Sequence, residues 1–300
     1  MQSIIPSQDL GYSQVSKLID RLLEKYSFLK CKSVGRSCAG REIFCLVPCE
    51  SNEYVLYAAA FHGSENITCN IALMFTEQLC EALQTGGEIA GLDARRAFYG
   101  RGVMVLPLVN PDGCEISVCG EAGAGYAAGR IKRLCGGNLR EWNANLRGVD
   151  INHNFPAGWD TLRAREKENG IYGPSPTRFG GFAPASEPET VALCNLCREN
   201  DIRHVMALHT QGEVIYWSWG DKAPARSAKM AEIMAAESGY ALDYPSGLAE
   251  GGGFKDWFIE HTGRPGFTLE IGKGKNPLPA NELPRLYSSV SDMLTLCAIM

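Results

Sequence analysis

Three short, largely apolar runs in this 300-residue chain each end at or near a histidine or a carboxylate, and this pattern limits the folds that the chain can adopt. The runs span residues 55–60, 203–208 and 266–271. Such runs are typical of strands buried on both faces of a parallel sheet, whose carboxyl ends lie along one edge. We therefore expect an α/β fold that gathers polar side chains at that edge.

The first run leads into a histidine and a carboxylate three residues apart, His62 and Glu65. A neutral imidazole and a carboxylate on one tight turn can bind the same Zn²⁺ ion, and a hydrolytic zinc site usually takes one more protein ligand and leaves a position for water. With five histidines and 34 acidic residues, about 0.6 such pairs are expected by chance, so the spacing alone does not identify a site. Its position just past a strand end makes the pair a candidate.

Four other histidines are available as the third ligand, and His209 is the best placed. It lies at the carboxyl end of the second run and is followed by a Thr-Gln-Gly turn, so it repeats the placement of His62. His204 lies near the start of the same run, where a structural role is expected. His261 follows an amphipathic stretch and is expected at a helix end, where its positive form would suit the helix dipole.

The third run carries a carboxylate, Glu270, between Leu269 and Ile271. A buried and unpaired carboxylate is strongly disfavoured, so Glu270 either forms a salt bridge or lies at the mouth of a site near a metal. We favour the second interpretation because the other two runs also end in candidate ligands. Beside a zinc ion and its water, Glu270 would take the proton as water attacks a carbonyl and would deliver it to the leaving amine.

Five segments, taken in chain order, resemble the zinc carboxypeptidase family over almost the whole chain. They are residues 61–65 (Phe-His-Gly-Ser-Glu), 106–113 (Leu-Pro-Leu-Val-Asn-Pro-Asp-Gly), 148–155 (Gly-Val-Asp-Ile-Asn-His-Asn-Phe), 207–209 (Ala-Leu-His) and 267–270 (Phe-Thr-Leu-Glu). The resemblance implies one Zn²⁺ ion on His62, Glu65 and His209, with Glu270 as the general base.

Within that family, residues 147–159 and 252–258 are most similar to bacterial γ-D-glutamyl-diaminopimelate peptidases, which cut cell-wall peptides. The resemblance implies a peptide or muropeptide substrate. Where digestive carboxypeptidases have an Asn-Arg pair that binds the terminal carboxylate, this chain has Asn152 and His153. Histidine lacks the bidentate fork of a guanidinium, so we expect carboxylate binding to be weaker or to use another cation.

The loop that closes over the substrate also departs from the family, because its tyrosine has no evident match in residues 244–253. The glycines of this segment still allow a flexible lid. Both departures favour a branched substrate with additional carboxylates over simple removal of a C-terminal residue. Lys255 and Arg264 are candidate partners for such a carboxylate, and either is equally explained as a solvated surface charge. Asn152, His153 and Lys255 are our candidate substrate-binding residues.

Stabilisation of an oxyanion requires a cation or hydrogen-bond donors near the metal. The family resemblance implies an arginine upstream of the Asn-His segment, where the chain has Arg133, Arg140 and Arg147. Spacing does not decide among the three, and we favour Arg140. Asp150 and Asn154 are expected to fix the backbone of their loop through local hydrogen bonds.

We expect one catalytic domain over residues 1–300, built as a mixed, mostly parallel sheet with helices on both faces. No Pro-, Ser- or charge-rich linker marks a boundary. Strands are expected near residues 41–48, 55–60, 102–107, 203–208 and 266–271, and helices near residues 14–26, 70–84, 187–199 and 226–238. Residues 114–147 and 156–186 are expected to be long loops of the kind that build pockets.

The net charge of −5, with scattered basic residues, argues against nucleic acid or an anionic membrane as a partner. Five basic residues between positions 130 and 147 either attract an anionic muropeptide or form a solvated face. The first ten residues lack the basic stretch and apolar core of a signal peptide, and no run approaches a membrane span, so we expect a cytoplasmic protein. Twelve cysteines agree with free thiols in a reducing compartment. The sequence does not indicate which oligomeric state the protein adopts.

These observations predict metal-assisted hydrolysis of an amide bond in a cell-wall-type peptide, at the bond between γ-D-glutamate and meso-diaminopimelate. Three alternatives are a zinc carboxypeptidase for ordinary peptides, a zinc hydrolase that deacylates N-acyl amino acids, and a non-catalytic protein that binds wall fragments. Activity on an N-acyl amino acid but not on a peptide would favour deacylation. Glu270 argues against the binding role, because a binding module does not need a general base.

Overall fold

The computed structural model describes residues 3–300, in which strands and helices alternate along much of the chain. The strands are β1 (Lys30–Arg36), β2 (Glu42–Cys49), β3 (Tyr54–Ala59), β4 (Glu88–Ile89), β5 (Leu92–Asp93), β6 (Gly102–Leu106), β7 (Ile202–His209), β8 (Val214–Tyr216), β9 (Ala241–Asp243) and β10 (Gly266–Glu270). The α-helices are α1 (Tyr12–Lys25), α2 (Ile67–Thr85), α3 (Ala94–Ala97), α4 (Pro111–Cys119), α5 (Glu121–Ala124), α6 (Ala128–Leu134), α7 (Trp159–Glu168), α8 (Pro188–Glu199), α9 (Arg226–Ser238), α10 (Phe254–Thr262) and α11 (Leu283–Ile299). The 3₁₀-helices are η1 (Gly63–Glu65), η2 (Gly125–Ala127), η3 (Leu139–Glu141), η4 (Ile151–His153), η5 (Gly247–Ala249) and η6 (Ala280–Glu282).

Eight of the strands form one central sheet in the order β1-β2-β6-β3-β7-β10-β8-β9. The central strands β6, β3, β7 and β10 run parallel to one another, as do β8 and β9. The pairs β1–β2, β2–β6 and β10–β8 are antiparallel. The structure therefore confirms the predicted mixed, mostly parallel sheet.

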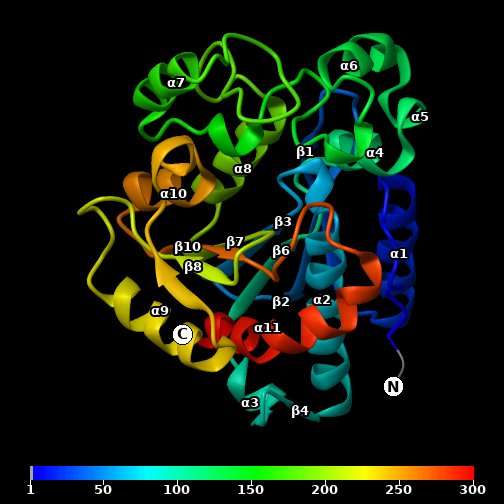
Figure 1. Ribbon diagram of the computed structural model, residues 1–300. Helices are drawn as coiled ribbons and strands as arrows, with labels where there is room; N and C mark the ends of the chain where they lie inside the picture. The colour runs from blue at the N-terminus through cyan, green and yellow to red at the C-terminus, as the bar shows by residue number, and fades with distance from the viewer. Residues whose placement is uncertain (1–2) are drawn as a thin grey trace.

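Helices cover both faces of this sheet, as Figure 1 shows. One core contains apolar side chains of α1, α2, α9 and α11, and the other contains those of α8 and α10. Alternate residues of β3 point into opposite cores: Val55, Tyr57 and Ala59 into the first, and Leu56 and Ala58 into the second. A strand that is apolar at every position is thus buried on both faces, as its sequence predicts.

The same alternation determines the direction of the polar residues at the strand ends. Leu208 of β7 and Leu269 of β10 lie in the core with α2 and α11. The next residue of each strand, His209 or Glu270, therefore points to the opposite face, where α10 packs. His209 and Glu270 are paired in the parallel register of β7 and β10, so the sheet itself places them side by side.

The four predicted helices are confirmed as α1, α2, α8 and α9, but the two expected loops were wrong in part. Residues 114–147 contain most of α4 together with α5 and α6, and residues 156–186 contain α7. The short helices of the first segment pack around a third apolar core that includes Ile116, Ile131 and Trp142. Their stability comes from this packing, which a short helical pattern does not reveal.

Across residues 3–300, no helix combines the length and the apolar character that crossing a bilayer requires. All twelve cysteines are free thiols, in agreement with the sequence expectation. Cys194 and Cys197 are buried in the core beside α10.

Candidate functional site

The turn after β3 is held in place by side chains from two other segments. Ala60 has a left-handed backbone (φ 55°), and its N–H donates to Thr68 Oγ1 at 2.9 Å. The Thr68 hydroxyl in turn donates to the carbonyl oxygen of Glu65 at 2.8 Å. Asn110 donates its backbone N–H to Ala60 O at 3.0 Å and its side-chain amide to Phe61 O at 2.9 Å. These contacts fix the backbone from which the side chains of residues 62–65 project.

Gly63 lies between the two candidate ligands of this turn, and its surroundings leave no room for a side chain. A Cβ atom at this position would collide with the backbone carbonyl oxygens of Gly113 and Trp142. The close approach of three backbone segments therefore requires glycine here.

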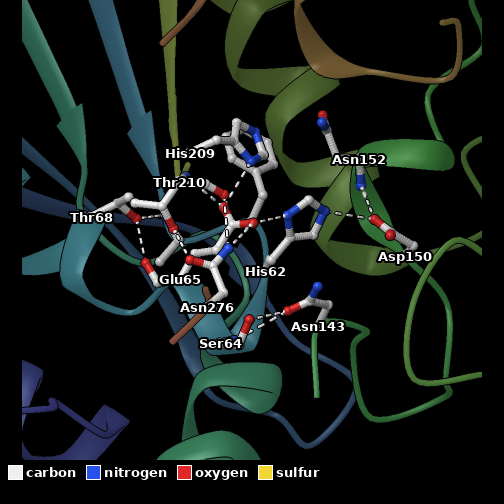
Figure 2. A network of polar contacts seen from close by, with 12 residues as sticks. His62, Ser64, Glu65, Thr68, Asn143, Asp150, Asn152, His209, Thr210 and Asn276 are labelled. Carbon is white, nitrogen blue, oxygen red and sulfur yellow. Dashed lines mark hydrogen bonds and ion pairs between the residues drawn. The ribbon is translucent and has the colours of Figure 1, made fainter. Parts of the chain in front are cut away.

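The side chains of His62, Glu65 and His209 converge at the carboxyl ends of β3 and β7 (Figure 2). Glu65 lies between the two rings: Oε1 is 2.9 Å from His62 Nδ1, and Oε2 is 3.0 Å from His209 Nδ1. The ligand atoms of the three residues all lie within 4.8 Å of one another. These three residues are the zinc ligands predicted from the sequence, and the structure brings them together.

Asp150 holds His62 from the opposite side. Its Oδ1 is 2.9 Å from His62 Nε2, and its Oδ2 accepts the backbone N–H of Arg178 at 2.8 Å. Burial disfavours the charged form of Asp150, but His62 and the hydrogen bonds from His62 and the Arg178 backbone outweigh this effect and hold the pKa of the carboxyl well below its usual range. The expectation that Asp150 only fixes its own loop was incomplete, because its carboxylate also orients a candidate ligand.

Thr210 and Asn276 complete the surroundings of Glu65 (Figure 2), and neither was predicted. The Thr210 N–H donates to Glu65 Oε2 at 3.1 Å, and the Asn276 amide donates to Glu65 Oε1 at 3.4 Å. Burial alone would raise the pKa of Glu65, but His62 and His209 outweigh it and lower the pKa to about 2. Thr210 directly follows His209, so its place in the sequence could have identified it as a neighbour of the site. Asn276 lies in no recognisable sequence pattern.

This donor set fits a zinc ion. Two imidazole nitrogens and a carboxylate face one point, and His2Glu is a ligand set of hydrolytic zinc sites. The remaining nitrogen of His62 is held by the Asp150 carboxylate, which is how proteins commonly orient a metal-bound imidazole.

Glu270 lines the same cavity, which has a volume of about 150 Å³. Burial raises the pKa of its carboxyl to about 8, and the neighbouring Glu65 carboxylate adds to this effect. Within the described part of the chain, Glu270 has no ion-pair partner. This favours the predicted position beside a metal site over the alternative of a structural salt bridge.

Asn152, His153 and Lys255, the predicted substrate-binding residues, also line this cavity. Asn152 Oδ1 accepts the N–H of Phe254 at 3.0 Å, which leaves the amide NH₂ group as the donor for a ligand. Lys255 is buried and donates to Ser218 O at 2.5 Å.

His153 is less suited to bind a carboxylate than predicted. Its Nδ1 lies 2.9 Å from Glu166 Oε1, and a carboxylate only accepts, so Nδ1 is the donor. Burial lowers the pKa of His153, which favours the neutral ring. A neutral ring that donates from Nδ1 has an acceptor at Nε2, so His153 offers no donor to a substrate carboxylate.

The structure does not support the assignment of Arg140 to oxyanion stabilisation. Its guanidinium is 62% exposed and pairs with Asp9 at 2.9 Å. Arg147 pairs with Glu187, and Arg264 pairs with Asp201. Among residues 3–300, no arginine lines the cavity. Proximity in sequence to Asn152 was a poor guide, because the Arg140 guanidinium instead pairs with Asp9 at the surface.

Comparison with known proteins agrees with the zinc-type ligand set of this site. The profile of the zinc carboxypeptidase family matches residues 15–290. An uncharacterized protein of Bacillus subtilis (strain 168) is 34% identical over 286 residues, which cover 94% of this chain and 75% of that protein. Gamma-D-glutamyl-L-diamino acid endopeptidase 1 of Lysinibacillus sphaericus is 34% identical over 283 residues, which cover 93% of this chain and 70% of that one.

The fold is also found among solved structures. Bovine thrombin-activatable fibrinolysis inhibitor, in its complex with tick carboxypeptidase inhibitor, superimposes with a TM-score of 0.77 and 18% identity and covers 97% of both chains. The match of the family profile over most of the chain and the two relatives at 34% identity agree with the five segments recognised in the sequence. This chain therefore belongs to the zinc carboxypeptidase family, a family of zinc-dependent metallopeptidases.

Proposed function

We propose that this protein hydrolyses the amide bond between γ-D-glutamate and a diamino acid, meso-diaminopimelate, in cell-wall peptides. The observation that carries the hydrolytic part is the convergence of His62, Glu65, His209 and Glu270 on one small cavity. The substrate class is supported by the relative at 34% identity, whose name describes a gamma-D-glutamyl-L-diamino acid endopeptidase.

The metal site has a defined role in this proposal. His62, Glu65 and His209 would hold Zn²⁺, which supplies Lewis acidity toward the scissile carbonyl and lowers the pKa of a water molecule. Asp150 positions the His62 ring through Nε2, and Thr210 and Asn276 donate hydrogen bonds that fix Glu65.

Glu270 acts as the general base and then as the general acid. Its position at the end of β10 is fixed by pairing with His209 across the parallel strands. Its carboxylate takes a proton from the attacking water and returns it to the leaving amino group. Asn152 donates its amide N–H groups to the carboxylate of the leaving residue, because neutral His153 does not provide a donor there.

The test is mass spectrometry of the tripeptide L-Ala-γ-D-Glu-meso-diaminopimelate after incubation with zinc-loaded protein. The proposal predicts release of free diaminopimelate by the wild type and a loss of at least about 100-fold in rate for Glu270→Gln. Glu199→Gln is the matched control, since it makes the same chemical change at an exposed position near the end of α8. The absence of cleavage by zinc-loaded wild type would refute the proposed substrate. Release of a C-terminal residue from ordinary peptides, or of an acyl group from N-acyl amino acids, would then identify the alternative.

A further inference from the structure

The backbone of Arg178 is held directly behind the candidate ligand His62. Its N–H donates to Asp150 Oδ2 at 2.8 Å, and the other oxygen of Asp150 is 2.9 Å from His62 Nε2. The next residue, Phe179, is fully buried, and its carbonyl oxygen accepts the Asp150 N–H at 2.8 Å. Figure 2 shows this aspartate on the side of His62 away from Glu65. Two hydrogen bonds with Asp150 thus fix the backbone of this segment beside the site.

The side chain of Arg178 takes no part in this attachment. It is exposed, and among residues 3–300 its guanidinium has no hydrogen-bond or ion-pair partner. Arg140, Arg147 and Arg264, by contrast, each pair with a carboxylate. Arg178 therefore provides a free positive charge whose five N–H donors are all available to a ligand.

The backbone conformation of Arg178 is unusual for a residue with a side chain. Its φ is 67°, in the left-handed region that glycine adopts most readily. A glycine would make the same backbone hydrogen bond to Asp150 without the steric cost of a Cβ atom, so the loop itself does not require an arginine here. An outlier of this kind at a site is a reason to look for a function of the side chain.

The guanidinium of Arg178 lies near the cavity but outside it. Among the lining residues are His153 and Asn152, but not Arg178. Burial lowers the pKa of His153, and the positive charge of Arg178 adds to this effect, so the two side chains are within electrostatic reach of each other. In the proposed function, the cavity of about 150 Å³ holds the leaving residue. The acyl part of the substrate then extends out of the cavity, where Arg178 is the free cation.

We propose that Arg178 binds the free α-carboxylate of the γ-linked glutamate, on the acyl side of the scissile bond. The inference rests on the proposed function and specifies its substrate class: an acidic residue that is linked through its side chain. In such a residue the side-chain carboxyl forms the scissile amide, so the α-carboxylate stays free. In an ordinary peptide the α-carboxyl is itself part of the scissile amide, so no such carboxylate is left. A planar guanidinium binds a carboxylate through two parallel hydrogen bonds, and Arg178 thereby distinguishes the two linkages.

The experiment compares kcat/KM of the zinc-loaded wild type for two tripeptides that differ in one group. The first is L-Ala-γ-D-Glu-meso-diaminopimelate, and in the second the α-carboxylate of the D-glutamate is converted to a carboxamide. The two peptides are nearly equal in size, so the comparison isolates the charge. An ion pair at an exposed position changes a rate by up to about fivefold, and a bidentate pair lies at the upper end of this range. The wild type should therefore prefer the first peptide by about fivefold.

Two variants assign this preference to Arg178. In Arg178→Gln the preference should disappear, and in Arg178→Lys, which keeps the charge but loses the fork, it should fall to about twofold. Arg96→Gln is the matched control and should keep the preference of the wild type. Arg96 is also exposed and also donates its N–H to an aspartate, but it lies in α3, which leads into the start of β6 at the opposite edge of the sheet. An unchanged preference in Arg178→Gln, or an equal loss of kcat/KM on both peptides, would overturn the inference.

The wild-type comparison keeps the test decisive if a variant fails to fold. Equal cleavage of both peptides by the wild type would overturn the inference while the proposed function stands. Cleavage of neither, with zinc bound, would overturn the proposed function and the inference with it. As a direct readout of binding, the product L-Ala-D-Glu should inhibit the wild type at a concentration about fivefold lower than L-Ala-D-isoglutamine, whose α-carboxyl is amidated. Equal inhibition by the two dipeptides would contradict the inference.

Discussion

The Asp150→Asn substitution tests whether the contact behind His62 controls metal binding. Asp150 is 1% exposed, and three N–H groups converge on its two oxygens. Oδ1 lies 2.9 Å from His62 Nε2 and 3.2 Å from the backbone nitrogen of Asn152, and Oδ2 lies 2.8 Å from the backbone nitrogen of Arg178. The amide side chain of asparagine has nearly the same shape but only one acceptor oxygen.

The expected magnitudes follow from this count of donors. If the amide oxygen stays at His62, the amide NH₂ group faces the Arg178 N–H, and one backbone donor loses its partner. That loss costs about 1–3 kcal/mol in the free energy of unfolding of the metal-free protein. The hydrogen bond to His62 also loses its charge, and loss of such a partner commonly weakens metal binding about 10- to 100-fold, or about 1.4–2.7 kcal/mol.

The assay is competition for Zn²⁺ between the protein and a chromogenic chelator at fixed pH, combined with urea unfolding of the metal-free protein. Asp221→Asn, at an exposed position, is the matched control and should change neither quantity measurably. If Asp150→Asn stays folded and binds zinc within twofold of the wild type, the contact between Asp150 and His62 does not orient a metal ligand. The assignment of His62 would then be in doubt as well.

Three further predictions concern the rest of the chain. Burial raises the pKa of Glu189 from 4.5 to about 7. The stability that the protonated Glu189 side chain contributes is therefore fully present below pH 4.5 and is lost as the pH rises through 7. Between pH 4.5 and 8 the wild type should therefore lose about 3 kcal/mol more than Glu189→Gln in urea unfolding, and identical pH profiles would contradict this. Gly63→Ala should lower the free energy of unfolding by about 1–3 kcal/mol, because the added Cβ atom collides with two backbone carbonyl groups. Gly173→Ala is the control and should have little effect, because a Cβ atom there meets only open space. Arg140→Gln should leave kcat/KM on the tripeptide within about twofold, because its exposed ion pair with Asp9 contributes little, and a 100-fold loss would restore its assignment to the oxyanion.

The parts of the fold that were predicted from the sequence are the segments whose pattern of apolar residues matches the way in which they pack. β3, β7 and β10 are buried at nearly every position because both of their faces are covered, and their largely apolar sequences therefore predict where they lie. Residues at the carboxyl ends of parallel strands share one edge, which is why His209 and Glu270 could be placed without a structure.

Other parts depend on contacts that no local pattern encodes. β8 and β9 are three residues each, and they are defined by pairing with β10 and with each other. α5 has four residues and is stabilised within the third apolar core. Asn276 reaches Glu65 from 211 positions away, through a loop whose composition gives no sign of it. For such residues the sequence limits what each side chain can do, but only the tertiary structure shows what it contacts.

The site combines two ways of positioning a side chain, and they should respond differently to mutation. His209 and Glu270 project from paired strands, so the register of β7 and β10 fixes both backbones at once. His62 and Glu65 project from a turn that depends on hydrogen bonds from Thr68 and Asn110. We therefore expect the loss of one of those hydrogen bonds to shift both candidate ligands, and a change at the surface of the sheet to shift neither strand. Substitutions in the supports of the turn should therefore lower metal affinity more than equally conservative substitutions beside the strands, because only the turn lacks a ladder of backbone hydrogen bonds on both sides.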